Sequence, residues 1–331
     1  MLGRMVTVEP EVEKTPFRDL DVTGSDSSLR RFLHGLPGVD QVGAEQRAAS
    51  LSTRSIKTSA KAYALDLAIS MVDLTTLEGQ DTDGKVRTLA AKAISPDPSD
   101  PTCPSTAAVC VYADLVATAK HALGDSGVHV AAVATAFPSG RAAMDIKLAD
   151  TKDAVEAGAD EIDMVIDRGA FLSGRYLEVF EEIAQVREAC KRRSGPDAHL
   201  KVILETGELQ TFDNVRRASW LAMLAGGHFI KTSTGKAASG ATPGVVLVML
   251  EAIRDYAERS GRAVGMKAAG GVSTSKAALH RLVLVKETLG DDWLTPDRFR
   301  IGASSLLNDL LMQYQKTETG RYARPEDFSK E

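Results

Sequence analysis

Residues 228–270 decide the fold; they read HFIKTSTGKAASGATPGVVLVMLEAIRDYAERSGRAVGMKAAG. A short apolar run at 228–234 precedes a long amphipathic stretch, Pro243–Arg259, and a second short apolar run follows at 263–270. Short apolar runs bounded by Gly and Ser predict buried strands, and the longer stretch of helix formers predicts a helix. The segment therefore predicts two parallel strands joined by a helix.

The same alternation extends from residue 70 almost to the C-terminus. Eight apolar runs predict strands, at 71–76, 107–112, 128–137, 160–167, 200–206, 228–234, 263–270 and 299–305. The helical stretches between them include Met144–Ala157, Leu177–Arg193, Asp213–Ala225, Pro243–Arg259 and Ser275–Thr288. A doubly wound sheet usually has fewer strands and a GxGxxG turn, which this sequence lacks. Eight such units over about 250 residues match the (β/α)8 barrel, also called the TIM barrel.

The first 57 residues differ from the rest, because they are polar, contain proline and show weak periodicity. We interpret residues 1–57 as an N-terminal extension, partly irregular, with short helices at Ser28–Leu33 and Ala44–Leu51. A firmer helix is predicted at Ser59–Ile69. The barrel is expected over residues 58–315 and a C-terminal tail over 316–331.

Composition narrows the class of protein. The chain is 44% hydrophobic and 26% charged, which is ordinary for a globular protein, and its net charge of −5 disfavours a general nucleic-acid or membrane-surface binder. Cys103, Cys110 and Cys190 form no CxxC pair, and no apolar segment resembles a signal peptide or a membrane span. The six histidines make no HExxH or HxH pair, so no metal is expected. A reducing, cytoplasmic location follows as an expectation.

Two lysines occupy unusual positions, since Lys231 and Lys267 each stand at the end of a predicted strand. Barrel active sites form at the C-terminal ends of the strands, so both lysines are candidates. One such lysine alone is usually a solvated loop charge. Two on adjacent strands suggest an activated amine, because a second cation disfavours the charged form and frees a nucleophile for Schiff-base chemistry. Spacing does not decide which lysine is the nucleophile.

Carboxylates at strand ends are the next candidates. Asp163 in EIDMVID would point into the barrel, where it could relay protons or act as a structural counter-ion for the lysines. Asp73 and Glu205 also lie at strand ends. Cys110 on the second strand could face the pocket, and a buried structural thiol is an equal alternative.

Three loops at the same end of the barrel favour an anion. They read TSTGK after the sixth strand, GGVSTS after the seventh and GASS after the eighth. Glycines let the backbone approach a ligand closely, and barrels bind phosphate in the loops after strands seven and eight. Lys236 could add a positive charge. We therefore expect a phosphate site.

These motifs together resemble the deoxyribose-phosphate aldolase family. The matching pieces run in family order through VDLTTL (72–77), AAVCVY (107–112), EIDMVID (161–167), LKVILETGEL (200–209), FIKTSTGK (229–236), GMKAAGGV (265–272) and RIGASSLL (300–307). The resemblance spans about residues 58–312. It implies a lyase without a cofactor, which cleaves 2-deoxy-D-ribose 5-phosphate reversibly to D-glyceraldehyde 3-phosphate and acetaldehyde through a Schiff base, in deoxyribose phosphate catabolism.

The resemblance also implies roles for individual residues. Lys231 would form the Schiff base, Lys267 would tune its pKa, and Asp163 with Lys267 would relay protons. Asp73, Cys110 and Thr234 would line the substrate pocket. The phosphate would be surrounded by Gly235, Lys236, Gly270, Gly271, Gly302, Ser304 and Ser305.

The sequence departs from the family at two places. Ser273 stands where many bacterial members carry an arginine. Some members end in a tyrosine, whereas this chain ends EDFSKE, and Tyr322 is the tyrosine nearest to that end. Two other readings stay open: a Schiff-base aldolase acting on a different phosphosugar, and a barrel that binds a phosphosugar without catalysis. The partner in each case is a small phosphosugar, and a homodimer is the expected assembly.

Overall fold

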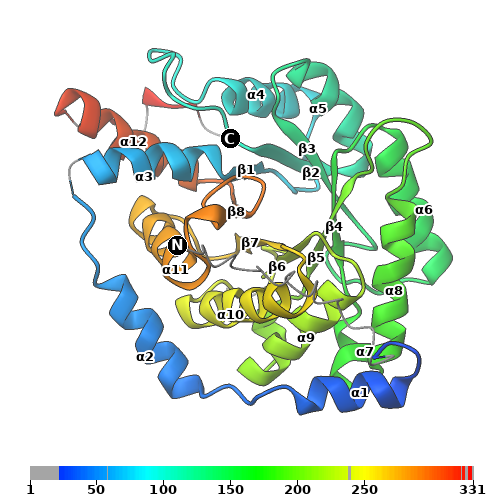
Figure 1. Ribbon diagram of the computed structural model, residues 1–331. Helices are drawn as coiled ribbons and strands as arrows, with labels where there is room; N and C mark the ends of the chain where they lie inside the picture. The colour runs from blue at the N-terminus through cyan, green and yellow to red at the C-terminus, as the bar shows by residue number, and fades with distance from the viewer. Residues whose placement is uncertain (1–21, 58, 238–239, 322, 325–326, 330–331) are drawn as a thin grey trace, which may run out of the picture.

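The computed structural model is a closed barrel of eight parallel strands ringed by helices (Figure 1). The structure describes residues 22–57, 59–237, 240–321, 323–324 and 327–329. The strands follow one another around the barrel in chain order, and β8 closes it by pairing with β1. They are β1 Val72–Thr75, β2 Ala108–Tyr112, β3 His129–Ala134, β4 Glu161–Val165, β5 His199–Ile203, β6 Phe229–Lys231, β7 Gly265–Ala269 and β8 Phe299–Ala303. The predicted (β/α)8 fold is confirmed.

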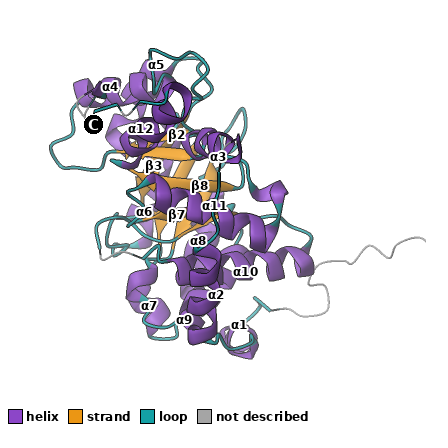
Figure 2. Ribbon diagram, turned by 90° about the vertical axis from the view of Figure 1, so that its left-hand side faces the viewer, coloured by secondary structure: helices purple, strands orange, loops and turns teal. Residues whose placement is uncertain are grey.

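The helices lie outside the barrel (Figures 1 and 2): α3 precedes β1, α12 follows β8, and the others connect successive strands. Several begin at a side-chain cap: Thr242, for example, accepts a hydrogen bond from the backbone N–H of Val245, and Pro243 occupies the first turn. They are α3 Ser59–Ser70, α4 Asp83–Ile94, α5 Val116–Leu123, α6 Met144–Glu156, α7 Arg168–Leu172, α8 Tyr176–Ala189, α9 Phe212–Leu224, α10 Pro243–Ser260, α11 Ser275–Leu289 and α12 Leu306–Thr319.

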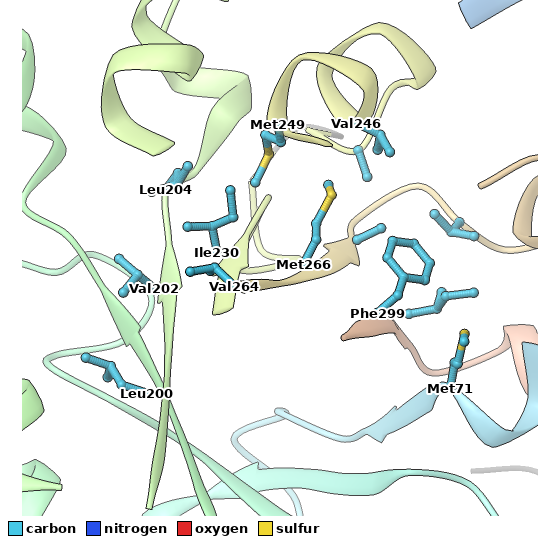
Figure 3. Packing of buried hydrophobic residues seen from close by; sticks show 14 of the residues in the cluster. Met71, Leu200, Val202, Leu204, Ile230, Val246, Met249, Val264, Met266 and Phe299 are labelled. Atoms are coloured by element: carbon cyan, nitrogen blue, oxygen red, sulfur yellow. The ribbon is translucent and has the colours of Figure 1, made fainter. Parts of the chain in front are cut away.

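The core lies between the barrel and its ring of helices. Side chains alternate along each strand, so every second residue points outward and packs against a helix. Figure 3 shows this contact around β6 and β7, where Ile230 and Met266 lie beside Val246 and Met249 of α10. All four side chains are fully buried. The other half of each strand faces the barrel interior and is free to carry polar groups.

Strand β6 is shorter than predicted, because it ends at Lys231 and not at residue 234. Beyond Lys231, the hydroxyl of Thr232 donates to the carbonyl of Ala269 at 2.6 Å and accepts from the backbone N–H of Ala269 at 2.8 Å. A side chain therefore takes over bonds that a longer ladder would supply. Thr232 still bonds to Lys267 and Thr206 through its backbone, and the chain leaves the sheet after it.

Two helices of the extension cover one side of the barrel's outer ring (Figures 1 and 2). Helix α1, Asp26–Gly35, packs on α8 and α9, and α2, Gln41–Ser52, packs on α10 and α11. Both were predicted and both are a few residues longer than expected. Residues 1–21 of the predicted extension lie outside the described residues. Helix α12 runs across residue 315, and the division at 57 and 315 stays a prediction.

Within the described ranges, no helix is long and apolar enough to cross a membrane.

We predict that the extension contributes to the stability of the barrel. Leu33 of α1 is fully buried. Leu33→Ala should lower the free energy of unfolding by about 2–4 kcal/mol, because it removes buried methyl groups and leaves a cavity. Val42→Ala on α2 is the control, since Val42 is 63% exposed and should change stability little. Urea unfolding of both variants measures this, and a Leu33→Ala variant as stable as the wild type would contradict it.

Candidate active site

The interior of the barrel is charged where many barrels are apolar. The strand register places Lys231 of β6 directly beside Lys267 of β7, and Asp163 of β4 beside Lys201 of β5. All four side chains are buried. They face inward because side chains alternate along a strand, and neighbours such as Ile230 and Met266 point outward to the helices.

Asp163 holds the two predicted lysines together. Its Oδ2 atom accepts from Lys231 Nζ at 2.7 Å and from Lys267 Nζ at 2.9 Å. Lys267 Nζ also lies 2.6 Å from an oxygen of Asp73. The structure therefore brings Lys231, Lys267, Asp163 and Asp73 into one cluster.

A second group of charges lies toward the N-terminal end of the barrel and was missed from the sequence. Lys201 contacts Glu161. The guanidinium group of Arg300 donates to a carboxylate oxygen of Glu161 at 3.0 Å and to one of Asp73 at 2.7 Å. Lys201 also lies 3.3 Å from Asp163. The signal was present in the sequence, because Glu161 precedes Asp163 by two residues and Arg300 precedes Gly302 by two. Period-two counting from the predicted site would have identified both.

The charges in this described part of the interior do not balance. Lys201, Lys231, Lys267 and Arg300 face three carboxylates, so a fully ionised set carries one excess positive charge. His129 touches Glu161 from the rim at 3.0 Å and adds to that excess when protonated. A buried excess charge is costly, and loss of a proton from one lysine removes it.

The two candidate lysines respond in opposite directions. Burial is the largest effect on Lys231 and lowers its pKa; the Asp163 carboxylate opposes this, and the Lys267 charge lowers the pKa further. For Lys267, burial alone would lower the pKa, but Asp163 and Asp73 together raise it well above its ordinary value. Burial alone would raise the pKa of Asp163, yet the cations around it hold that pKa well below its ordinary value. Lys231 is thus the amine most easily deprotonated.

A cavity of about 430 Å³ opens above the lysines at the C-terminal end of the strands. Lys231 and Lys267 form part of its floor, and Thr234 lies on its wall. Every residue expected around a phosphate also lines it: Gly235, Lys236, Gly270, Gly271, Gly302, Ser304 and Ser305. Ser273 lies on the same lining.

Two glycine positions explain the shape of this cavity. Gly270 and Gly271 have φ of +84° and +91°, in the region that favours glycine, so the chain can turn sharply after β7. A Cβ atom on Gly302 would come within 2.8 Å of Lys267 Cε. The absence of a side chain at Gly302 therefore leaves room for the lysine.

The wall of the cavity carries two further contacts. Glu205, fully buried after β5, accepts from the hydroxyl of Thr234 at 2.5 Å and from its backbone N–H at 3.2 Å. Lys236 at the mouth lies 2.8 Å from Glu78, which comes from the loop after β1. The first contact fixes the loop after β6. The second joins two partly exposed side chains at the mouth of the cavity.

Asp73 and Cys110, expected in the pocket lining, lie beneath the cavity and do not form its lining. Asp73 serves as a carboxylate partner of Lys267 and Arg300. Cys110 is fully buried in a small apolar cluster with Leu77, Ala131 and Val133, and its Sγ lies 4.0 Å from an oxygen of Asp163. Burial, the largest effect, raises the pKa of the Cys110 thiol. Tyr322 lies outside the described residues.

A deprotonatable lysine beneath a cavity with glycine-rich walls can attack a carbonyl carbon, and a neighbouring carboxylate can accept the proton released. The fold and this site define a barrel enzyme of the lysine-dependent lyase class. Comparison with known proteins makes the class specific: residues 67–312 match the model of the DeoC/LacD family aldolases. The chain belongs to this family.

Known relatives agree with this assignment. The chain is 47% identical to the deoxyribose-phosphate aldolase of Mus musculus and 45% identical to that of Homo sapiens. Each match extends over 285 residues and covers 83% of this chain and 88% of the relative. The solved deoxyribose-phosphate aldolase of Aeropyrum pernix is 22% identical, with a TM-score of 0.58 over 78% of this chain and 93% of that one, and supports the fold.

We predict that Lys267 keeps the pKa of Lys231 low. Lys267→Met removes the neighbouring positive charge and leaves Asp163 to Lys231, so the pKa of Lys231 should rise. The pH dependence of reductive methylation of Lys231, followed by mass spectrometry between about pH 6 and 10, should move to higher pH. Lys191→Met, an exposed lysine after α8, is the control and should leave the profile unchanged. An unchanged profile or a shift to lower pH in Lys267→Met would count against this role.

Proposed function

We propose that this chain is a deoxyribose-phosphate aldolase, which cleaves 2-deoxy-D-ribose 5-phosphate reversibly to D-glyceraldehyde 3-phosphate and acetaldehyde. Family membership and the named relatives support the reaction. The observation that carries the assignment of residues is the contact of Lys231 with Asp163 at the floor of the cavity.

The first chemical step is attack by the neutral Lys231 amine on the C1 aldehyde of the open-chain sugar. The carbinolamine oxygen receives the proton that left the amine and a second proton from Lys267 or water, departs as water, and leaves a protonated imine. Asp163, 2.7 Å from Lys231 Nζ, accepts the proton that the amine gives up, and Lys267 stabilises the carboxylate from the other side. The amine is available because Lys231 is the lysine whose pKa is lowered.

The second step breaks the bond between C2 and C3. The C3 hydroxyl loses its proton, the C2–C3 electron pair moves into the imine, and the C3 fragment leaves as glyceraldehyde 3-phosphate. The enamine that remains on Lys231 takes a proton at C2, and water then releases acetaldehyde. We assign the proton transfers to Asp163 and Lys267, directly or through water in the cavity.

The phosphate is proposed to bind in the loops at the far end of the cavity. Helix α12 begins there after Ser305, whose side chain caps no backbone N–H of the helix. The first turn therefore offers N–H groups to an anion, and the helix dipole favours negative charge at that end. Binding the phosphate away from the reacting carbons would orient the sugar over Lys231.

Lys231→Leu should abolish cleavage of deoxyribose phosphate, with a loss of at least about 1,000-fold in kcat, because it removes the amine whose pKa is lowered and which is proposed to form the intermediate. Retention of a few per cent of activity by a folded variant would exclude Lys231 as the nucleophile. Mass spectrometry after borohydride reduction in the presence of acetaldehyde locates the adduct directly. An adduct on a different lysine, or none, would also overturn the assignment.

The alternatives separate on other measurements. A Schiff-base aldolase for a different phosphosugar would form the same reduced adduct, so identification of the cleavage products distinguishes it. A non-catalytic binding barrel predicts that Lys231→Leu changes no lysine-dependent turnover. The second reading is disfavoured because binding alone needs no buried pair of lysines with opposite pKa shifts.

Lys236 and Glu78 provide a test of the phosphate assignment. Lys236→Gln should raise KM for deoxyribose phosphate about fivefold, because a phosphate contact is lost. Glu78→Gln should lower KM by a few-fold, because Glu78 competes with the phosphate for Lys236. Steady-state kinetics with 2-deoxyribose lacking the phosphate is the control, and neither change should affect it. Equal effects on both sugars would contradict the placement of the phosphate.

We further propose that the enzyme works in a reducing, cytoplasmic setting. Its three cysteines are free and buried. Homodimer formation and the division into extension, barrel and tail are also proposals, which gel filtration and limited proteolysis can test.

A further inference from the structure

Arg281 of α11 is a buried cation behind the loops that line the cavity. The residue is 6% exposed, and its Nη2 atom donates to the carbonyl of Ala241 at 2.6 Å. Its Nε atom is buried and has no hydrogen-bond partner in the described part of the chain. Ala241 belongs to the connection between β6 and α10, so the guanidinium group lies under one wall of the site.

The charge of Arg281 is not matched by a carboxylate among the described residues. Other buried cations differ: Lys147 lies 2.6 Å from Glu182, and Arg300 bridges Asp73 and Glu161. Burial lowers the pKa of Arg281 to about 10, so the side chain is still protonated at neutral pH. An unmatched buried charge is costly, and an anionic ligand nearby would offset that cost.

Short contacts connect Arg281 with the cavity. The backbone N–H of Ala241 donates to the carbonyl of Gly270 at 3.3 Å, and Gly270 is part of the cavity lining. One residue therefore separates the guanidinium from the wall, a distance on the order of 10 Å. At this range, and with little water between, a positive charge still acts on a phosphate dianion.

The uncharged residue Ser273 on the cavity lining can be compared with the cation Arg281 behind it. Ser273 lies on the cavity lining and contributes no charge there. Arg281 stands eight residues further along, two turns into the helix that begins after this loop. The chain thus has a cation close to the site, but behind its wall.

We propose that Arg281 is a positioning and specificity residue for the phosphate: it holds the Ala241 segment against Gly270 and supplies, from behind, positive charge that the Ser273 position lacks. The inference rests on the proposed function in its choice of substrate. The electrostatic effect does not depend on that substrate, because the same charge would stabilise any dianion in these loops.

Arg281→Gln removes the charge and retains an amide donor. KM for deoxyribose phosphate should rise about tenfold, with kcat nearly unchanged, and kcat/KM for 2-deoxyribose without phosphate should stay the same. Arg281→Lys should stay within about threefold of the wild type, because the charge is kept. Lys276→Gln is the matched control, since it removes an exposed charge from the same helix and should have no effect. An equal loss of kcat/KM on both sugars would show that Arg281 has only a structural role and would overturn the proposal. No loss on either sugar would overturn it as well.

Two further measurements cover other failures. If the wild type does not cleave deoxyribose phosphate, the proposed function fails, but stabilisation of the fold by inorganic phosphate still tests Arg281 through the rise in Tm. That rise should be largely lost in Arg281→Gln, and an equal rise in both proteins would refute the inference. If Arg281→Gln does not fold, Ser273→Arg in the wild type should change KM for deoxyribose phosphate by less than about threefold, because the charge is already supplied. A large improvement would show that Arg281 supplies none.

Discussion

The Asp163 carboxylate, set among Lys201, Lys231 and Lys267, is the interaction on which the site depends. Three buried ammonium groups would repel one another, and each would lose much of its hydration. Asp163 contacts all three, so its own burial is offset and its pKa stays low. A closed barrel makes this possible, because the inward residues of β4, β5, β6 and β7 meet on one axis while the outward residues supply the apolar core.

The proposal that Lys231 is the reactive lysine rests on how the carboxylates are shared. Lys201 lies within 4 Å of Asp73, Glu161 and Asp163, and Lys267 lies within 4 Å of Asp73 and Asp163. Lys231 has Asp163 alone among the described residues. The excess positive charge of the interior is therefore removed most easily at Lys231, which also borders the cavity. The reactivity proposed for Lys231 would result from having fewer carboxylate partners than Lys201 and Lys267 have.

Much of the fold and part of the site could be predicted from the sequence. Period-two alternation and Gly-Ser loops placed Lys231, Lys267 and Asp163 at the same end of a barrel, because these are local patterns. Lys201, Glu161 and Arg300 were missed because only the C-terminal ends of the strands were expected to carry the site, although period-two counting marks Glu161 and Arg300 as inward-facing. Arg281 was beyond this reasoning for a related cause: it lies in a helix, and only the packing of α11 against the loop after β6 buries it.

The two ends of the cavity are held by different means, and this difference bears on how the site can diversify. The lysine end is built from strands, whose register fixes each charge relative to its neighbours. The loop end depends on side-chain contacts such as Glu205 with Thr234, where Glu205 itself adopts a left-handed backbone conformation (φ +53°) at a cost of about 1 kcal/mol or more. A buried carboxylate that bonds both the N–H and the hydroxyl of Thr234 can offset that strain. Substitutions in these loops, for example at Ser273, can therefore alter the loop end of the cavity without disturbing the strand-borne lysines.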